Sequence, residues 1–142
     1  MQPVHKLYSS NERVFKMNME GITHEESLKQ MNHCNTLNWV VGHLVLSRNS
    51  VLAMLNLPAA PAEAMKEVYG RGVANPDMGK AMNIETLKSM YLDTQPLIMS
   101  ALDKTSDEAL LEKLAFSGMH EAYHMGQIGM LRKMLGKEGA IK

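Results

Sequence analysis

The residues with the clearest chemical potential are two histidines near the end of the chain, His120 and His124, in the segment MHEAYHMGQIGMLRKMLG. On an α-helix, residues four apart are offset by about 6 Å along the axis and roughly 40° around it. Both imidazoles can therefore face one divalent metal ion and offer it neutral ring nitrogens. The same five residues, HEAYH, also match the zinc-protease pattern H-E-x-x-H. The spacing indicates a metal site, and the rest of the chain must decide its kind.

The protease interpretation assigns a general-base role to Glu121, acting on metal-bound water, and needs a third ligand farther along the chain. The extended pattern with a further glycine and histidine is absent, because Gln127 and Met130 occupy those positions. Glu138 is the only acidic residue after His124, and the sequence offers no strand that could pair with an extended peptide. Peptidase activity is therefore not expected, and Glu121 is interpreted as an exposed helix residue.

The histidine pair belongs to a polar stripe, since His120, His124 and Gln127 recur at helical spacing. The simplest alternative is a solvated helix face that carries two histidines by accident. Glycines at positions 118, 126 and 129 argue against it, because glycine inside a helix costs about 0.5–1 kcal/mol relative to alanine. These glycines suggest the close approach of another helix, and a metal would satisfy two buried imidazoles.

A third ligand should come from elsewhere, since two histidines make a poor site for a divalent metal. We favour His43, which alone lies in a long apolar run, NWVVGHLVL, where an unpaired imidazole would be costly. By itself, a histidine in such a run is more often a hydrogen-bonded core residue than a ligand. The pair in the last helix puts the two interpretations on an equal footing. The other candidates are His5, His24, His33 and Cys34.

Composition limits the class of protein. The 142 residues are 45% hydrophobic, which suits one domain spanning residues 1–142, and the fourteen methionines are interpreted as packing between helices. Fifteen basic and fifteen acidic residues cancel without a basic stripe, so nucleic-acid binding is not expected. The lone Cys34 is compatible with a reducing cytosol. No segment resembles a signal peptide or a membrane span, and we expect a cytoplasmic protein.

Hydrophobic periodicity is helical over nearly the whole chain. Gly21 should follow the end of the first helix, whereas Asn35 and Asn83 should cap the second and third. Pro96 lies inside the third helix and should kink it, because proline removes one backbone hydrogen bond. The predicted fold is all-α, a four-helix bundle with helices at about 4–20, 36–56, 83–103 and 107–135.

A long connection is expected between the second and third helices. The turn at residues 58–61 should end the second helix, and residues 62–82 should be irregular apart from one short helical piece before Tyr69. Capping-box patterns at residues 23–26 and 105–108 predict two further helix starts, the latter beginning the last helix.

Two segments resemble a known family. NWVVGHL on the second helix and HEAYHMGQIGMLRKMLG on the last are similar to the DinB superfamily, also called the DinB/YfiT-like metalloenzymes. The family pattern has a histidine in a G-H-L-like context, then H-x-x-x-H followed closely by G-Q. The resemblance extends over nearly the whole chain, including the helix order and the long connection. The second motif is fairly specific. The first is weak evidence alone and supports the resemblance only together with the second.

The resemblance implies a four-helix bundle, commonly dimeric, that holds nickel or zinc with three histidines. By position these are His43, His120 and His124, and Gln127 matches the glutamine of the family. Many members carry a further histidine where this chain has Tyr123, so the ligand triad is intact and the role of that extra histidine is open. Gln127 and Tyr123 are expected to support the ligands or line the pocket.

Three ligands from two helices leave a coordination position for water or a thiol. Relatives in the superfamily include thiol-dependent transferases and isomerases, and this resemblance favours a low-molecular-weight thiol. The predicted function is a metal-dependent enzyme, a thiol S-transferase or a hydrolase, in which no further catalytic residue is assigned. One alternative is a non-catalytic helical dimer that a metal stabilises. A third interpretation is an interaction bundle with exposed histidines.

Overall fold

The chain is all-α in a computed structural model that describes residues 2–59, 63–73 and 76–141. No strand occurs within these described ranges. The helices are α1 (Pro3–Met19), α2 (His24–Ser27), α3 (Leu37–Met54), α4 (Glu63–Tyr69), α5 (Ile84–Asp93), α6 (Gln95–Leu102) and α7 (Glu108–Met134), with a 3₁₀ turn η1 at Met78–Lys80.

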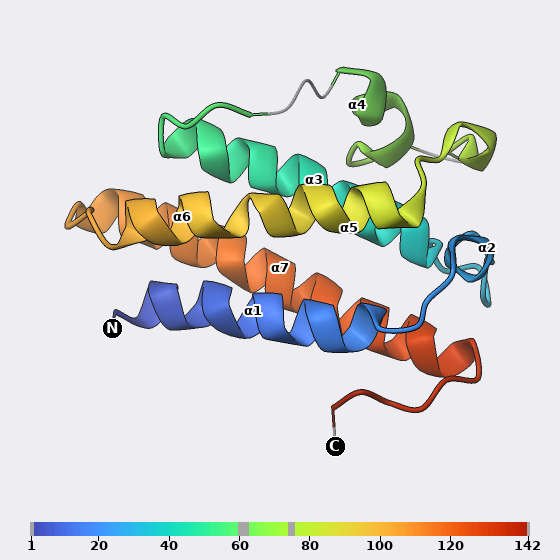
Figure 1. The fold of residues 1–142 in the computed structure, drawn as a ribbon. Helices are drawn as coiled ribbons and strands as arrows, with labels where there is room; N and C mark the ends of the chain where they lie inside the picture. Colours follow the sequence, from blue (N-terminus) through green and yellow to red (C-terminus); the bar gives the residue numbers. More distant parts are fainter. Residues whose placement is uncertain (1, 60–62, 74–75, 142) are drawn as a thin grey trace.

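The long helices α1, α3 and α7 run side by side with the successive helices α5 and α6 (Figure 1). Helix α7 packs against both α1 and α3, whereas α5 packs against α3 and α6 against α1. Helix α4 lies against α3, away from α1. The two helices that carry the candidate ligands, α3 and α7, are therefore direct neighbours.

Local capping explains most helix starts. The box predicted at residues 23–26 is confirmed, because Thr23 and Glu26 cap each other's backbone in α2. The cap predicted at Asn83 is also confirmed. Two other predictions are wrong by one or two residues. Thr36 rather than Asn35 caps α3 through its hydroxyl, and the box at residues 105–108 is absent, because the Asp107 side chain accepts the N–H of Leu110.

The predicted third helix is broken in two rather than kinked. Helix α5 ends at Asp93, and α6 begins at Gln95 with Pro96 in its first turn. Proline cannot donate a backbone hydrogen bond, yet its fixed φ angle suits the first turn of a helix. The Thr94 hydroxyl donates to the carbonyl of Tyr91 at 2.7 Å, which closes the end of α5.

The connection after α3 follows the prediction in outline. Helix α3 ends at Met54, slightly before the predicted end at residue 56, and Asn56 takes a positive φ of 54°. Residues 60 and 61 of the predicted turn lie outside the described residues. Helix α4 is the short helical piece expected before Tyr69, and η1 is an additional turn.

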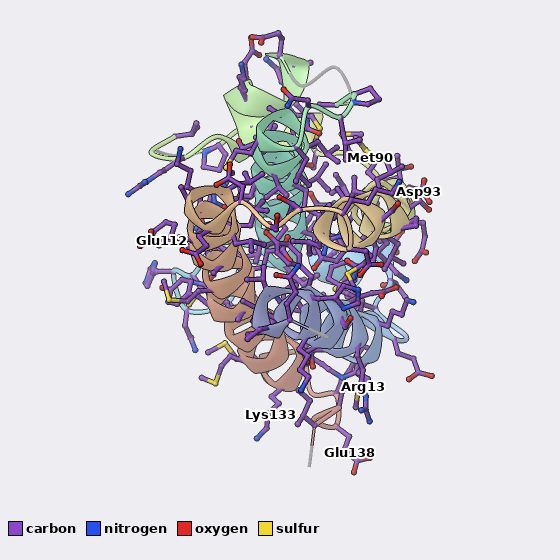
Figure 2. The ribbon with its side chains drawn as sticks, turned by 90° about the vertical axis from the view of Figure 1, so that its left-hand side faces the viewer. Arg13, Met90, Asp93, Glu112, Lys133 and Glu138 are labelled. Carbon is purple, nitrogen blue, oxygen red and sulfur yellow. The ribbon has the colours of Figure 1, made fainter. Side chains whose placement is uncertain are left out.

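The core lies between the helices in two clusters of buried apolar side chains, the larger around α3 and the smaller near the start of α1. Several methionines pack against these clusters, as the composition predicted. Charged side chains such as Arg13, Glu112 and Lys133 point outward in the end-on view of Figure 2. None of the described helices combines the length and the apolar character that a bilayer crossing requires.

Glycines mark close contacts between helices, though not at every position expected. A Cβ atom at Gly118 would come within 2.7 Å of Leu7 on α1, so this glycine permits α1 and α7 to approach. Nothing lies within 4 Å of a Cβ at Gly126, so the close approach predicted there is wrong. A Cβ at Gly42 would overlap the ring of Tyr69, which is buried and fixed by hydrogen bonds.

We predict opposite effects for alanine at two of these glycines. Gly42→Ala should lower the free energy of unfolding by about 1–3 kcal/mol, because the buried Tyr69 ring has no room to retreat. Gly126→Ala should raise it by about 0.5–1 kcal/mol, because only the intrinsic helix preference changes. Urea denaturation measures both values. Equal effects of the two substitutions would contradict this packing.

Candidate metal centre

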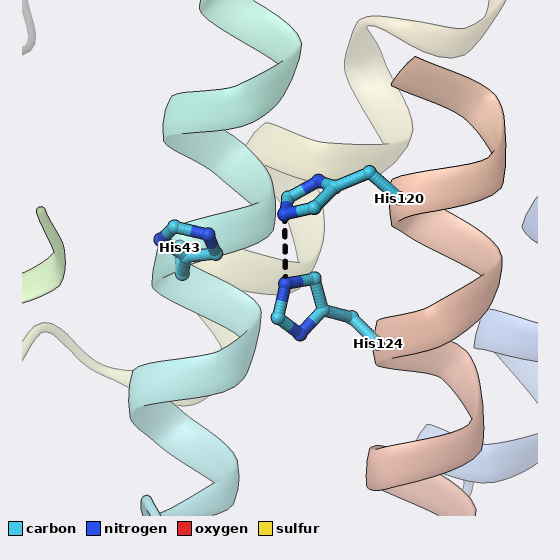
Figure 3. A group of neighbouring side chains, drawn as sticks. All are labelled: His43, His120 and His124. Carbon is cyan, nitrogen blue, oxygen red and sulfur yellow. Dashed lines mark hydrogen bonds between the residues drawn. The ribbon is translucent and has the colours of Figure 1, made fainter. Parts of the chain in front are cut away.

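The structure brings the three predicted ligands together between α3 and α7 (Figure 3). One ligand nitrogen from each of His43, His120 and His124 lies within 4.8 Å of the other two. Among the described residues, they form the one group of three or more potential metal ligands whose ligand atoms lie this close together. The choice of His43 as third ligand required its ring to lie beside the other two, although its helix is remote in sequence, and the structure places it there.

The other candidates for a third ligand lie elsewhere. His5 pairs with Asp103 at 3.2 Å. His24 accepts the backbone N–H of Ile84 through Nδ1 at 3.2 Å, which links α2 to the start of α5. His33 and Cys34 are exposed in the segment before α3. None of them belongs to the histidine cluster.

The distances in the cluster fit a metal centre. The Nε2 atoms of His120 and His124 are 3.0 Å apart. Tetrahedral zinc with Zn–N bonds of 2.0–2.1 Å requires ligand nitrogens separated by about 3.3 Å. The widest separation in the cluster, 4.8 Å, therefore has to close by roughly 1.5 Å around such an ion, which small side-chain rotations can supply.

Hydrogen bonds set the tautomers of two rings in the form that binds metal. The Nδ1 atom of His43 lies 3.0 Å from the carbonyl oxygen of Tyr69, and Nδ1 of His124 lies 2.7 Å from Oε1 of Gln127. Both oxygens accept only, so each Nδ1 carries the hydrogen and each Nε2 keeps its lone pair, that of His124 accepting a hydrogen bond from Nε2 of His120 at 3.0 Å. Oriented ring nitrogens of this kind are typical of metal ligands.

The charge state of the rings agrees with this assignment. The pKa of His124 is lowered to about 4, mainly by burial; the hydrogen bond that His124 donates to Gln127 opposes this shift, and the neighbouring rings of His120 and His43 add to it. Burial also lowers the pKa of His120; His43 and, more weakly, Arg71 add to this shift, whereas the charge of Glu121 opposes it. Both imidazoles are therefore neutral at pH 7, which is the form that coordinates a metal ion.

Two aromatic side chains flank the rings. Trp39, one turn before His43, stacks on its ring with centroids 4.8 Å apart and planes 9° from parallel. The Trp39 indole donates to the carbonyl of Val68 at 2.8 Å, which ties α3 to α4. The predicted pocket residue Tyr123 is mostly exposed and packs edge-on against His124. Sequence reasoning missed Trp39, although its spacing of four residues from His43 signals a contact on one helix face.

Glu121 is the main correction to the sequence analysis, because it is buried at 1% exposure rather than exposed. Residue 121 is rotated by about 100° from residue 120 on the helix, so its side chain enters the core. There it forms an ion pair with Arg48 of α3, which is fully buried. The guanidinium binds both carboxylate oxygens, Nε to Oε1 at 2.8 Å and Nη2 to Oε2 at 3.2 Å.

The remaining donors of Arg48 reach the junction of α5 and α6, where the chain leaves helical geometry. They bind the carbonyl of Tyr91 at 2.9 Å, the hydroxyl of Thr94 at 3.0 Å and the amide oxygen of Gln95 at 2.8 Å. The guanidinium also lies 3.6 Å above the ring of Tyr91. Burial alone would lower the pKa of Arg48, but Glu121 and Tyr91 raise it, so the guanidinium stays charged.

This network removes Glu121 from metal chemistry. The Tyr91 hydroxyl donates to Oε2 at 3.1 Å, and burial, together with the charge of Glu121, raises the pKa of that hydroxyl so that it stays protonated. Asn11 of α1 donates to the same oxygen at 3.4 Å. A carboxylate held by three side chains in the core is not available as a general base.

A cleft of about 740 Å³ opens beside the cluster, between α3, α4 and the first half of α7. His43 and His120 are among the residues that line it, so the candidate metal centre is accessible from this cleft. Its walls combine apolar side chains with hydroxyls and two cationic side chains. They include Leu46, Ser47, Ser50, Lys66, Arg71 and Phe116.

Comparison with known proteins gives no match, whether to a protein family, to a curated protein or to a solved structure. The assignment of function therefore depends on the residues and their geometry.

The buried ion pair gives a prediction about stability. Glu121→Ala should lower the free energy of unfolding by about 3–5 kcal/mol, because the buried charge of Arg48 loses its counter-charge. The double variant Arg48→Met/Glu121→Leu should be less destabilised than Glu121→Ala, since it leaves no unpaired charge. Urea denaturation of both variants tests the coupling. A double variant at least as unstable as the single one would show that the charges are not the cause.

Proposed function

We propose that this chain is a DinB/YfiT-like, metal-dependent enzyme in which His43, His120 and His124 hold a divalent zinc or nickel ion. The observation that supports this proposal is the convergence of three histidines, two of them held through Nδ1 so that the lone pair lies on Nε2. The hydrogen bond between His120 and His124 satisfies the lone pair of His124, whereas a single metal ion could take one nitrogen from all three rings.

The helix arrangement supports the same family. If α5 and α6 are taken as one helix interrupted at Thr94, then α1, α3, this pair and α7 form a four-helix bundle with a long connection before the third segment. Ligands of bundle metal sites come from facing helices, as they do here from α3 and α7.

The chain's own residues would orient the ligands and shape the open side of the centre. Tyr69 and Gln127 hold two rings by their Nδ1 atoms, and Trp39 restrains the plane of His43. When bound, a divalent metal would supply Lewis acidity that lowers the pKa of a coordinated thiol or water. Three protein ligands leave room for such a group.

A thiol substrate fits this site better than water. Hydrolysis commonly uses a carboxylate as general base, but Glu121 is held by Arg48, and Glu63 in the cleft pairs with Lys66 at 2.7 Å. A metal can ionise bound water without such a base as well, but the resemblance to thiol-dependent transferases favours a thiol, whose thiolate is a strong nucleophile. We therefore propose transfer of a low-molecular-weight thiol to an electrophile.

Metal content is the direct test. The protein, prepared without a metal-affinity tag, should contain close to one zinc or nickel per chain by elemental analysis. His120→Ala should lose most of this metal, whereas His33→Ala should keep it, because His33 is exposed and remote from the cluster. Equal and negligible metal in the parent protein and in His120→Ala would overturn the proposal.

Catalysis is tested on the same preparations. Conjugation of several low-molecular-weight thiols to a reactive electrophile should proceed with the metal and stop after chelation. If chelation only lowers the thermal stability and no thiol reacts, the metal is structural and the enzymatic part of the proposal is wrong.

We also propose that the chain forms a homodimer through the outer face of α7. Four large apolar side chains along this helix are more than half exposed: Phe116, Met119, Tyr123 and Met130. Gly126 lies between the last two of them on the same face and has open space around it. A second copy of α7 can approach closely there, and the same surface from each copy makes a two-fold interface.

Light scattering at micromolar concentration should give the mass of a dimer. Met119→Lys/Met130→Lys should give a monomer, because it places charges in the centre of this interface. Leu97→Lys, which changes an exposed apolar residue on α6, should leave the dimer intact. A parent protein that is monomeric at these concentrations would contradict the proposal.

A further inference from the structure

We propose that the cleft beside the histidines binds the anionic group of a substrate on Arg71, so that the enzyme prefers thiols bearing a carboxylate. This inference rests on the proposed function, since it concerns the substrate of the same centre. It depends on the balance of charge in the cleft, on the position of Arg71 and on the size of the space.

The charges in the cleft leave a positive excess. Of the carboxylates that line it, Glu121 is neutralised by Arg48 and Glu63 pairs with Lys66. Arg71 has no hydrogen bond or ion pair to any described residue. Imidazoles coordinate a metal in their neutral form, so a divalent ion bound by three of them would keep its full charge. An anion is therefore the ligand that the cleft attracts most strongly.

Arg71 lies where it can act together with the metal centre. It is two residues after Tyr69, whose carbonyl oxygen accepts a hydrogen bond from His43. It also lines the same cleft as His43 and His120. Its positive charge contributes to the lowered pKa of His120, after burial and the charge of His43, while the charge of Glu121 opposes the shift. A guanidinium offers a planar fork of donors that suits a carboxylate.

The space and its lining are suited to a substrate that spans both groups. The cleft, at about 740 Å³, is in the range of pockets for small organic molecules and far larger than a water molecule needs. Leu46 and Phe116 supply apolar parts of its wall. A substrate can thus place its sulfur at the histidines and its carboxylate on Arg71, with its aliphatic part against the apolar wall.

The preference can be measured on protein loaded with Co²⁺, in which a thiolate bound to the metal gives a charge-transfer absorption. Two matched pairs of probes differ only in charge: 3-mercaptopropionate with its amide, and 6-mercaptohexanoate with its amide. The longer pair excludes chelation of the metal by the carboxylate. We expect at least one acid to bind about fivefold to tenfold more tightly than its amide.

The variant Arg71→Gln should reduce this ratio to near one without changing the cobalt content or the affinity for the amides. Arg13→Gln serves as the control, because Arg13 is exposed on α1, which does not line the cleft (Figure 2). It should leave the ratio unchanged.

The outcomes separate this inference from the proposed function. Failure of the parent protein to bind cobalt would overturn both. If cobalt binds but the acids show no preference, or Arg71→Gln leaves the preference intact, only the role of Arg71 is overturned. An equal loss for acids and amides in Arg71→Gln would also overturn it, since the arginine would then act on the structure rather than on the charged group.

Discussion

The buried ion pair between Arg48 and Glu121 is the interaction on which the arrangement of helices depends. A fully desolvated guanidinium is tolerated only when its charge and all its donors are satisfied, and here the partners come from α7 and the α5–α6 junction. Tyr91 and Asn11 add contacts to the same carboxylate from α5 and α1. One cluster of polar groups therefore fixes how α7 is rotated against its neighbours. Since His120 precedes Glu121 in the chain, this rotation also directs its ring toward α3.

The sequence carried enough information for the all-α class, for most helix starts and for the choice of His43 as third candidate ligand. These predictions depend on local signals, such as capping side chains, helical periodicity and one imidazole in an apolar run. The prediction that Glu121 is exposed is wrong because its partner, Arg48, is 73 residues away, and no local pattern reports such a pairing. A charged residue within an apolar helix nevertheless indicates a buried polar partner. This reasoning, used for His43, could also have been used for Arg48. The roles of Tyr69 and Arg71 had no sequence signal, since both depend on where the long connection folds back.

The H-E-x-x-H pattern illustrates why a motif needs its structural context. The two histidines do face a common point, as the spacing requires, but the glutamate between them serves the core. These five residues thus use two adjacent faces of α7. The histidines face the candidate metal centre, and the glutamate faces the core. The break between α5 and α6 is linked to the glutamate, because the carbonyl of Tyr91 and the hydroxyl of Thr94 there accept hydrogen bonds from its partner Arg48.

Tyr69 has a consequence for how this protein can vary. Its ring fills the space left by Gly42, its hydroxyl donates to Asn38 and accepts the N–H of Met82, and its carbonyl determines which nitrogen of His43 carries the hydrogen. Inserting or deleting a residue within α4 would shift all three contacts at once. A change in the length of this surface segment would then alter which nitrogen of His43, on another helix, carries the hydrogen. Many surface segments tolerate insertions and deletions. In α4, such a change would disturb a candidate metal ligand as directly as a mutation of that ligand.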